Sequence, residues 1–292
     1  VTVPNQSDDG YVYDVNASEF ASYMKEIVEI GACVVGGCCG TTPEYIKAVT
    51  TLLKNQKLVP VEIKDKTVVT SYSQAVEIGA KNVPVLIGER INPTGKKKFK
   101  QALRDKDIPY IIHQGLEQEN AGAKILDVNV GLPEIDEKEM MVQVMTELQG
   151  VTSLPLQIDT ASPEVLEAAL RRYNGKALVN SVNGKTEVME AVFPIVKKYG
   201  GVVVALTLDE TGIPETSEGR IKIAEKIIAT AQKYGIAKKD IVVDALTMAV
   251  SSDINAAKAT LETVKYMTQK GINTILGVSN ISFGLPNREI VT

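Results

Sequence analysis

The pattern that decides the fold reads KILDVNVGLPEIDEKEMMVQVMTELQGVTSLPLQIDT, from Lys124 to Thr160. It begins with a short apolar run, turns at glycine and acidic residues, continues with apolar residues at helical spacing, and ends in a second apolar run. Both runs are nearly continuous, as in the strands of a parallel sheet that helices cover. The stretch therefore predicts a strand–helix–strand unit of an α/β protein.

The same alternation fills the chain from Val83 onward. The predicted strands are Val83–Gly88, Lys124–Asn129, Leu154–Asp159, Ala177–Asn180, Val202–Leu208, Ile241–Ala245 and Thr274–Val278. The predicted helices between them include Glu137–Leu148, Pro163–Tyr173, Met189–Tyr199, Glu218–Tyr234 and Ile254–Lys270. A closed (β/α)₈ barrel has one strand more than these seven, so we expect a barrel that lacks its last strand–helix unit.

Polar residues suited to chemistry recur where the predicted strands end. They are Asn129, Asp159, Asn180, Asp209, Asp244 and Asn280. A (β/α)₈ barrel carries its active site at that end of its strands, so this placement favours a barrel over a doubly wound sheet. One such residue is most simply explained as the cap of the following helix, whereas several around one barrel mouth indicate a shared site.

A separate unit precedes the barrel. The pattern predicts a helix at Ala17–Ile30, a short buried strand at Ala32–Val35 that includes Cys33, and a helix at Pro43–Lys54 with Thr42 as its N-cap. A helix–strand–helix piece cannot bury its faces alone. We expect it to be the tail of a second barrel, or, as a less favoured alternative, to fill the place of the missing eighth strand.

These patterns divide the chain into three segments. Residues 1–57 are the predicted remnant of the second barrel, 58–82 a linker, and 83–292 the truncated barrel. Within the linker, Thr67–Tyr72 is a candidate strand that caps the bottom of the barrel.

Composition narrows the class of protein. The 292 residues are 44% hydrophobic and 23% charged, with a net charge of −4 and no basic stripe. These values indicate a globular protein that binds neither nucleic acid nor a membrane surface. Cys33, Cys38 and Cys39 are too close together for a disulfide framework, which points to the cytoplasm. The single histidine, His113, lies between the first two predicted strands, and we expect it to be a bystander.

The strand ends together resemble a known family. The motif Gly88-Glu89-Arg90-Ile91-Asn92-Pro93-Thr94-Gly95 is similar to the opening motif of the pterin-binding (dihydropteroate synthase-like) family, which includes methyltetrahydrofolate methyltransferases. The later strand ends agree with that family: Leu126-Asp127-Val128-Asn129-Val130-Gly131, Gln157-Ile158-Asp159-Thr160, Val179-Asn180-Ser181, Asp244-Ala245-Leu246 and Gly277-Val278-Ser279-Asn280. The resemblance spans roughly residues 83 to 292 and implies a TIM-type barrel.

The resemblance also implies roles for single residues. Asp159, Asn180 and Asp244 would bind the pterin ring, because a carboxylate accepts paired hydrogen bonds from its amino and N–H groups. Asn92 and Asn129 would lie near the ring edge. Dihydropteroate synthases carry a lysine near the last strand end, where this chain has Asn280. Asn280 is therefore expected to act on the methyl-bearing nitrogen, together with Asp159 through a water.

The motif Gly36-Gly37-Cys38-Cys39-Gly40-Thr41 resembles the end of the barrel in zinc-dependent homocysteine methyltransferases. In that family two adjacent cysteines and one upstream cysteine hold the metal. The upstream cysteine has no counterpart here, so Cys38 and Cys39 would form an incomplete zinc site. The alternative that we favour for this chain alone is a pair of free thiols.

Together the two motifs resemble the cobalamin-dependent methionine synthase family. The resemblance implies that the chain binds 5-methyltetrahydrofolate and transfers its methyl group to cob(I)alamin in methionine synthesis from homocysteine. No Asp-x-His-x-x-Gly signature occurs, so cobalamin would come from a cobalamin-binding domain outside this chain. The alternatives are a dihydropteroate synthase-like pterin enzyme and a non-catalytic fragment that only binds folate.

Overall fold

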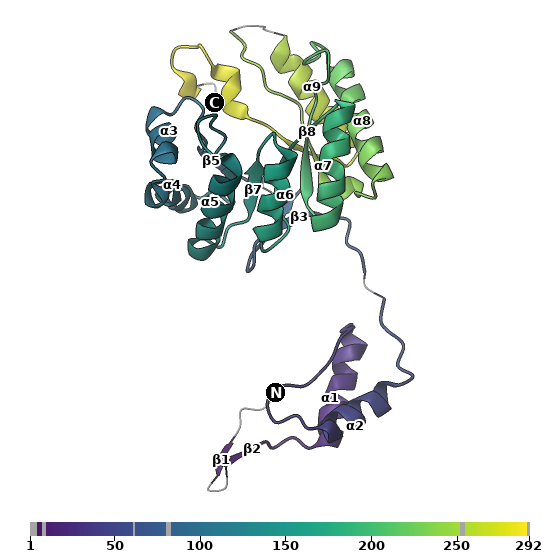
Figure 1. Cartoon of the computed structure of the whole chain (residues 1–292). Coiled ribbons are helices and arrows are strands. Elements are labelled where there is room, and N and C mark those ends of the chain that lie inside the picture. The colour runs from purple at the N-terminus through teal and green to yellow at the C-terminus, as the bar shows by residue number, and fades with distance from the viewer. Residues whose placement is uncertain (1–4, 8–9, 61, 80–82, 252–254, 291–292) are drawn as a thin grey trace. The chain divides into compact units, whose positions relative to one another are not determined.

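The computed structural model describes residues 5–7, 10–60, 62–79, 83–251 and 255–290 (Figure 1). The chain forms two compact units, Val1–Lys64 and Asp65–Thr292. None of the described helices is long and apolar enough to cross a membrane.

The first unit is small and mostly helical. Its elements are β1 (Asn5–Ser7), β2 (Gly10–Val12), α1 (Ala17–Ile30) and α2 (Pro43–Leu53). Asn16 begins α1 with a capping box, in which its side chain accepts from the backbone N–H of Glu19 and Glu19 bonds back. Both predicted helices are thus confirmed, although the Thr42 side chain makes no capping hydrogen bond.

The predicted strand at Ala32–Val35 is wrong. These residues form no strand, Cys33 is exposed rather than buried, and Val34 is 91% exposed. An extended segment needs a neighbouring strand to bond its backbone groups, and β1 and β2 pair with each other instead. Ala32–Val35 therefore does not supply the missing strand of the barrel.

The second unit is built on parallel strands. In the described residues, seven of them form one sheet in the order β11-β10-β9-β8-β7-β6-β5. The strands are β5 (Ile87–Ile91), β6 (Ile125–Val128), β7 (Leu156–Asp159), β8 (Leu178–Asn183), β9 (Val202–Leu206), β10 (Ile241–Asp244) and β11 (Asn273–Ile275). Every neighbouring pair is parallel.

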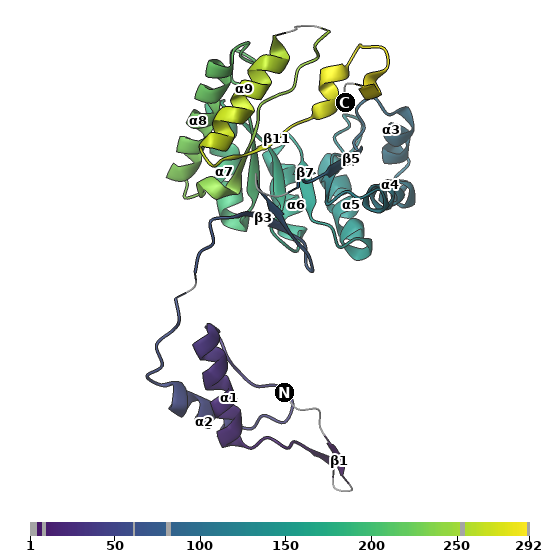
Figure 2. The same cartoon turned by 180° about the vertical axis from the view of Figure 1, so that it is seen from behind.

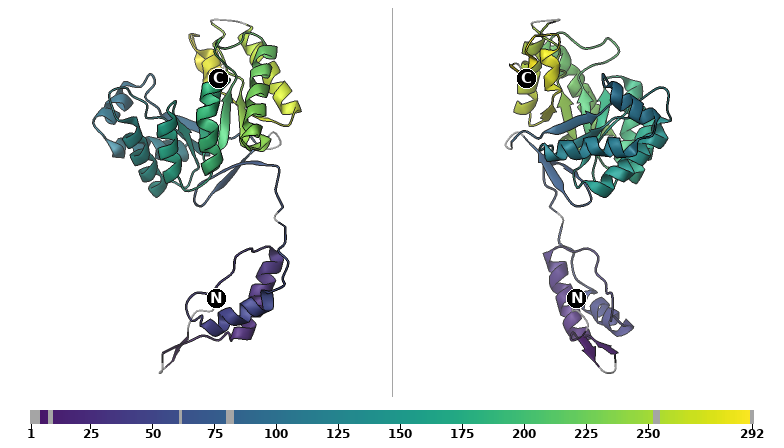
Figure 3. Two further views of the ribbon diagram at one scale, coloured as in Figure 1. Left: turned by 45° about the vertical axis from the view of Figure 1, so that its right-hand side comes forward. Right: turned by 90° about the vertical axis from the view of Figure 1, so that its left-hand side faces the viewer.

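Helices cover the outside of the curled sheet (Figures 1 and 3). They are α3 (Lys97–Arg104), α4 (Ile108–Asn120), α5 (Glu137–Val151), α6 (Pro163–Arg172), α7 (Thr186–Tyr199), α8 (Ser217–Lys233) and α9 (Ala256–Gln269). The 3₁₀ turns are η1 (Lys238–Asp240), η2 (Val278–Ser282) and η3 (Arg288–Ile290). The result is a near-complete (β/α) barrel, which confirms the predicted fold class.

Some predicted boundaries move. The first strand is Ile87–Ile91 instead of Val83–Gly88, and the last is Asn273–Ile275 instead of Thr274–Val278. Asn280 consequently lies in η2 and not directly at a strand end. Ile254, the predicted first residue of the last helix, lies outside the described residues.

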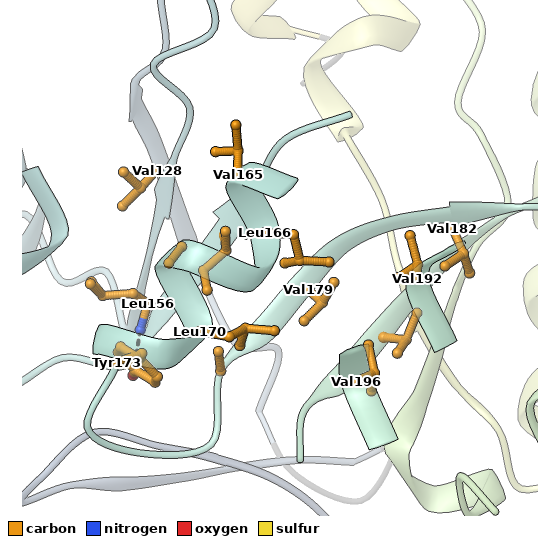
Figure 4. Packing of buried hydrophobic residues seen from close by; sticks show 14 of the residues in the cluster. Val128, Leu156, Val165, Leu166, Leu170, Tyr173, Val179, Val182, Val192 and Val196 are labelled. Carbon is orange, nitrogen blue, oxygen red and sulfur yellow. Dashed lines mark hydrogen bonds between the residues drawn. The ribbon is translucent and has the colours of Figure 1, made fainter. Parts of the chain in front are cut away.

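The strands bury a different set of side chains on each face. The outer set packs against the helices, as Leu156 and Val179 do against Leu166 and Leu170 of α6 (Figure 4). The inner set fills the barrel at the amino ends of the strands; it consists of Ile125, Leu178, Val202, Val204 and Val242, with Val69 packed among them. This alternation leaves the inner face free for polar groups at the carboxyl ends.

Val69 comes from a hairpin of β3 (Thr67–Thr70) and β4 (Ala75–Ile78). Thr67 Oγ1 donates to the Lys239 carbonyl at 2.6 Å, and the Tyr173 hydroxyl donates to the Thr70 carbonyl at 2.8 Å. The hairpin thus closes the bottom of the barrel, and the prediction of a capping strand within Thr67–Tyr72 is confirmed. Figure 2 shows β3 at the end of the sheet opposite η2 and η3.

Replacing Val69 with alanine tests how much this plug contributes to stability. Val69 is fully buried, so we expect the free energy of unfolding to fall by about 1–3 kcal/mol. Urea denaturation followed by circular dichroism measures the change. Val151→Ala on α5 is the control, because Val151 is 52% exposed and its truncation should change little. Equal effects of both substitutions would show that the hairpin is not part of the core.

Candidate functional site

Strand register places the predicted polar residues on the inner face of the barrel. Asn180 pairs with Val204, and Asp244 pairs with Leu206. Val204 and Leu206 both pack in the inner cluster, and paired residues of a parallel sheet point to the same face. Asp159 pairs with Asn180 in turn. Asp159, Asn180 and Asp244 therefore face the interior of the barrel, Asp159 and Asp244 from the last residues of β7 and β10 and Asn180 from the middle of β8, which continues to Asn183 beyond the predicted end of that strand.

Asn129 and Asp159 are joined directly. Asn129 Nδ2 donates to Asp159 Oδ2 at 2.9 Å, while Asn129 Oδ1 accepts from the Gly131 N–H at 2.9 Å. Burial raises the pKa of Asp159, the Asn129 hydrogen bond lowers it, and the nearby Glu89 and Glu137 raise it further. One oxygen of the Asp159 carboxyl is thus fixed in direction by Asn129.

Asp127 was not predicted as a site residue, yet it lies beneath this pair. It is 2% exposed, and Gln157 Nε2 donates to its Oδ1. Burial raises the pKa of Asp127 well above its ordinary value and Asp159 adds to this, while hydrogen bonds from Gln157 and Asn180 lower it. The polar network of the inner face therefore extends one layer deeper than the rim.

The spacing of polar residues in the sequence indicates this deeper layer of Asp127 and Gln157. Asp127 precedes Asn129 by two residues, and Gln157 precedes Asp159 by two. Residues two apart in a strand share a face, so each deeper residue lies below its rim partner. Gln157 Oε1 is buried and has no hydrogen-bond partner in the described part of the chain.

Asp244 occupies a second position on the rim. Its Oδ1 accepts from the Leu246 N–H at 2.8 Å. Burial raises the pKa of Asp244 to about 6, and the Leu246 hydrogen bond and the positive charge of Arg220 oppose that rise. This carboxyl therefore changes its charge near neutral pH.

The other two predicted barrel residues, Asn92 and Asn280, take no part in the hydrogen bonds described for Asp159 and Asp244. Asn92, at the end of β5, is 8% exposed, and its Oδ1 accepts from the Thr94 N–H at 2.8 Å to form a local turn. Asn280 is exposed in η2. A Cβ added at Gly277 would meet Asn280 Nδ2 at 3.1 Å, so the glycine leaves space for this amide.

Segment η2 is attached to the loop that follows β10. The Val250 N–H donates to the Ile281 carbonyl at 3.1 Å, and Ser251 Oγ donates to the Phe283 carbonyl at 2.7 Å. The chain then continues over the carboxyl ends of the strands toward α3 and β5 (Figures 1 and 2). Asn280 is thus carried by a mouth segment and not by the sheet. His113 lies on the outer helix α4, exposed and next to Glu117.

The thiols of the first unit meet only part of the requirement for zinc. Cys38 Sγ and Cys39 Sγ are 3.7 Å apart, and both residues are exposed. Two sulfurs on a tetrahedral zinc with bonds of about 2.3 Å are separated by roughly 3.8 Å, so the pair has suitable spacing. The described residues contain no group of three His, Cys, Asp or Glu side chains that could hold a metal. The thiol pair alone does not complete a zinc site.

Two family profiles match separate parts of the chain. The profile of pterin binding enzymes matches residues 88–291, and that of homocysteine S-methyltransferases matches residues 1–53. Two curated proteins named methionine synthase are similar over most of the chain. The protein of Mycobacterium tuberculosis (strain ATCC 25618 / H37Rv) is 31% identical over 89% of this chain and 23% of its own length. That of Mycobacterium leprae (strain TN) is 31% identical over 94% of this chain and 24% of its own length.

The chain thus spans about a quarter of the length of these relatives. Solved structures agree on the fold. A dihydropteroate synthase from Xanthomonas albilineans with 4-aminobenzoic acid aligns with a TM-score of 0.59 and 18% identity, over 73% of this chain and 77% of that one. The Yersinia pestis dihydropteroate synthase aligns with a TM-score of 0.57 and 15% identity, over 77% of this chain and 84% of that one.

Proposed function

The chain belongs to the pterin-binding enzyme family, and on that premise we propose that it binds 5-methyltetrahydrofolate and transfers the methyl group to cob(I)alamin in methionine synthesis from homocysteine. The observation that carries the proposal is the convergence of Asp159, Asn180 and Asp244 on the inner face of the barrel. The similarity to proteins named methionine synthase supports the choice of a methyl-transfer reaction.

The pterin ring would bind at the rim. Its amino and ring N–H groups form a pair of donors, and a carboxylate accepts both in parallel. Asp159 and Asp244 would each present a carboxylate, and Asn180 would bond a donor and an acceptor of the ring. Asn92 and Asn129 would lie at the ring edge, where Asn129 already orients Asp159.

In the transfer, the methyl carbon is attacked and the pterin nitrogen is the leaving group. A tertiary amine is a poor leaving group unless its nitrogen is protonated. Asn280 would donate a hydrogen bond to that nitrogen, and Asp159 would assist through a water. A donor aimed at the atom whose charge changes in the transition state speeds the reaction. Cobalamin, bound to a separate domain, would supply the nucleophilic acceptor of the methyl group.

The three segments would have distinct roles. Residues 1–57 would be the tail of a homocysteine-binding barrel, 58–82 a linker that carries the β3–β4 hairpin, and 83–292 the folate barrel. The match of residues 1–53 to homocysteine S-methyltransferases supports the first assignment. Cys38 and Cys39 would be two zinc ligands there, with the third supplied by residues outside this chain. Such an enzyme would work in the cytoplasm.

Titration calorimetry with 5-methyltetrahydrofolate tests the proposal, followed by methyl transfer to added cob(I)alamin. We expect saturable binding at one site and formation of methylcobalamin. Binding without transfer would favour a non-catalytic folate-binding fragment. Condensation of 4-aminobenzoic acid with a pterin pyrophosphate would favour a dihydropteroate synthase-like enzyme. Absence of binding would refute the proposed function.

Asp244→Asn is expected to make the protein more stable at pH 7 and to abolish folate binding. The pKa of Asp244 is about 6 in the folded protein, above its ordinary value of 3.8, because burial disfavours the charge. Between about pH 4 and 6, the folded state therefore keeps a proton that the unfolded chain has already released. The contribution of this carboxyl to stability falls as the pH rises through that range.

At pH 7 the neutral amide avoids this cost and still accepts from the Leu246 N–H, so the free energy of unfolding should rise by about 1–3 kcal/mol. Binding of 5-methyltetrahydrofolate should be lost, because the amide NH₂ faces a donor of the ring. Urea denaturation at pH 5 and 7 and calorimetry measure both effects. A variant that is less stable at pH 7 but binds normally would contradict both arguments.

A further inference from the structure

Arg220 is the largest of the fully buried side chains. It lies in the first turn of α8, is 1% exposed, and is surrounded by the loops at the carboxyl ends of β9 and β10. A buried guanidinium is costly unless its N–H groups are bonded, so its position requires a compensating set of acceptors.

The acceptors within the described part of the chain come from three segments of the mouth. Arg220 Nε donates to the Pro214 carbonyl at 2.9 Å. Its Nη1 lies 2.9 Å from the Ala245 carbonyl, 3.0 Å from the Leu246 carbonyl and 2.9 Å from Thr260 Oγ1. Arg220 thereby joins the loop after β9, the loop after β10 and helix α9.

One of these segments orients Asp244. Leu246 has a φ of +57°, a left-handed conformation that is costly for a residue with a side chain. In this conformation its N–H donates to Asp244 Oδ1 while its carbonyl faces Arg220. The contacts of Arg220 with the carbonyls of Ala245 and Leu246 hold the loop in the conformation that fixes the carboxyl.

Arg220 also acts on Asp244 through its charge. Burial raises the pKa of Asp244 to about 6, and the guanidinium opposes that rise. Two other acids on the adjoining elements, Asp209 and Glu262, have partners of their own, while Glu210, Glu215 and Glu218 lie on the loop after β9 and the first turn of α8. Asp209, after β9, accepts from Thr211, and Glu262, on α9, accepts from Ser217. Among the described residues, Arg220 is a charged side chain that lowers the pKa of Asp244.

We infer that Arg220 is a positioning residue for the pterin site: it clamps the Ala245–Leu246 turn so that Asp244 presents a carboxylate, in fixed orientation, to the donor pair of a bound pterin. The inference rests on the proposed function and adds a residue that does not touch the ligand. It separates two roles of one side chain, the hydrogen bonds that shape the loop and the charge that stabilises the carboxylate.

Three variants of the full chain separate these roles. Arg220→Met removes the charge and the hydrogen bonds, Arg220→Lys keeps the charge, and Thr260→Val removes one acceptor while keeping the arginine. Carbon-13 NMR of the aspartate carboxyls, with Asp244 assigned through Asp244→Asn, gives the titration midpoint of Asp244 without ligand. Calorimetry with 5-methyltetrahydrofolate between pH 5.5 and 8 gives the dissociation constant.

We expect Arg220→Met to raise the titration midpoint of Asp244 by about one pH unit, since a nearby opposite charge shifts a pKa by that order. This shift of the midpoint alone should weaken folate binding by the variant about 2-fold at pH 7 and about 8-fold at pH 5.5, and the loss of the hydrogen bonds that hold the turn should add a loss that does not depend on pH. Arg220→Lys should keep the wild-type midpoint while lowering the thermal midpoint of unfolding. Thr260→Val should also keep the wild-type titration midpoint of Asp244.

The inference would be overturned, in favour of a purely structural role, by two results together. The titration midpoint of Asp244 would stay unchanged in Arg220→Met, and Arg220→Met and Arg220→Lys would lose the same thermal stability. If Arg220→Met does not fold, Arg220→Gln is the second neutral variant and the same midpoint decides. Failure of the wild type to bind 5-methyltetrahydrofolate would refute the proposed function, and the ligand-free titration would still decide whether Arg220 controls Asp244.

Discussion

Replacing Asp159 with alanine is expected to abolish measurable binding of 5-methyltetrahydrofolate. The substitution removes the carboxylate that would accept two hydrogen bonds from the ring, and it leaves the Asn129 amide without the acceptor it now has at 2.9 Å. Hydrogen bonds that involve a charged group contribute about 1.5–3 kcal/mol each, so the loss should exceed roughly 100-fold in the dissociation constant. Calorimetric titration at pH 7.5 measures it.

Asp209→Ala is the matched control for this experiment. Asp209 is also a carboxylate that follows the end of a barrel strand, in this case β9. Its Oδ1 accepts from the backbone N–H and the hydroxyl of Thr211. We expect its removal to leave folate binding within about 3-fold of the wild type, since it belongs to a local turn. Comparable dissociation constants for the wild type and Asp159→Ala would rule out the pterin site as proposed.

Replacing Asn280 with alanine should separate binding from catalysis. Asn280 is exposed on the mouth segment η2, apart from the buried network around Asp159, so the ring should keep its main contacts. Loss of one donor aimed at the developing charge typically lowers a rate 100- to 1,000-fold, and we expect about this loss in methyl transfer. The absorbance change from cob(I)alamin to methylcobalamin follows the rate, and calorimetry follows the dissociation constant.

Ser279→Ala controls for disturbance of η2, because Ser279 is the preceding exposed residue of the same turn. This variant should transfer methyl groups at nearly the wild-type rate. If Asn280→Ala weakens binding while the transfer rate at saturating folate stays unchanged, the residue contributes to uniform binding rather than to the transition state. An unchanged rate would remove Asn280 from the mechanism.

Much of the barrel could be predicted because its strands are nearly continuous apolar runs and its longer helices have clear periodicity. Two kinds of error have physical causes. Helices α3 and α4 escaped prediction because the first is short and lysine-rich and the second mixes polar residues into its apolar face. The run Ala32–Val35 has the composition of a strand, but a strand also needs a neighbour that composition cannot reveal.

The positions of several candidate site residues could be predicted, while their roles stay predictions. Polar residues at strand ends identified the rim, and the hydrogen bond between Asn129 and Asp159 agrees with a shared position there. Asp127 was missed because it lies inside a strand, where a buried residue is expected to be apolar. Arg220 was missed because it lies on a helix, and its partners Ala245 and Leu246 are distant in sequence.

The hairpin beneath the barrel has a kinetic consequence. With Val69 filling the lower end, the folate of the proposed reaction would enter and leave through the upper opening. A bulky acceptor seated over that opening would cover whatever lies below it. We therefore expect a compulsory order, in which the donor enters first and its demethylated product departs last.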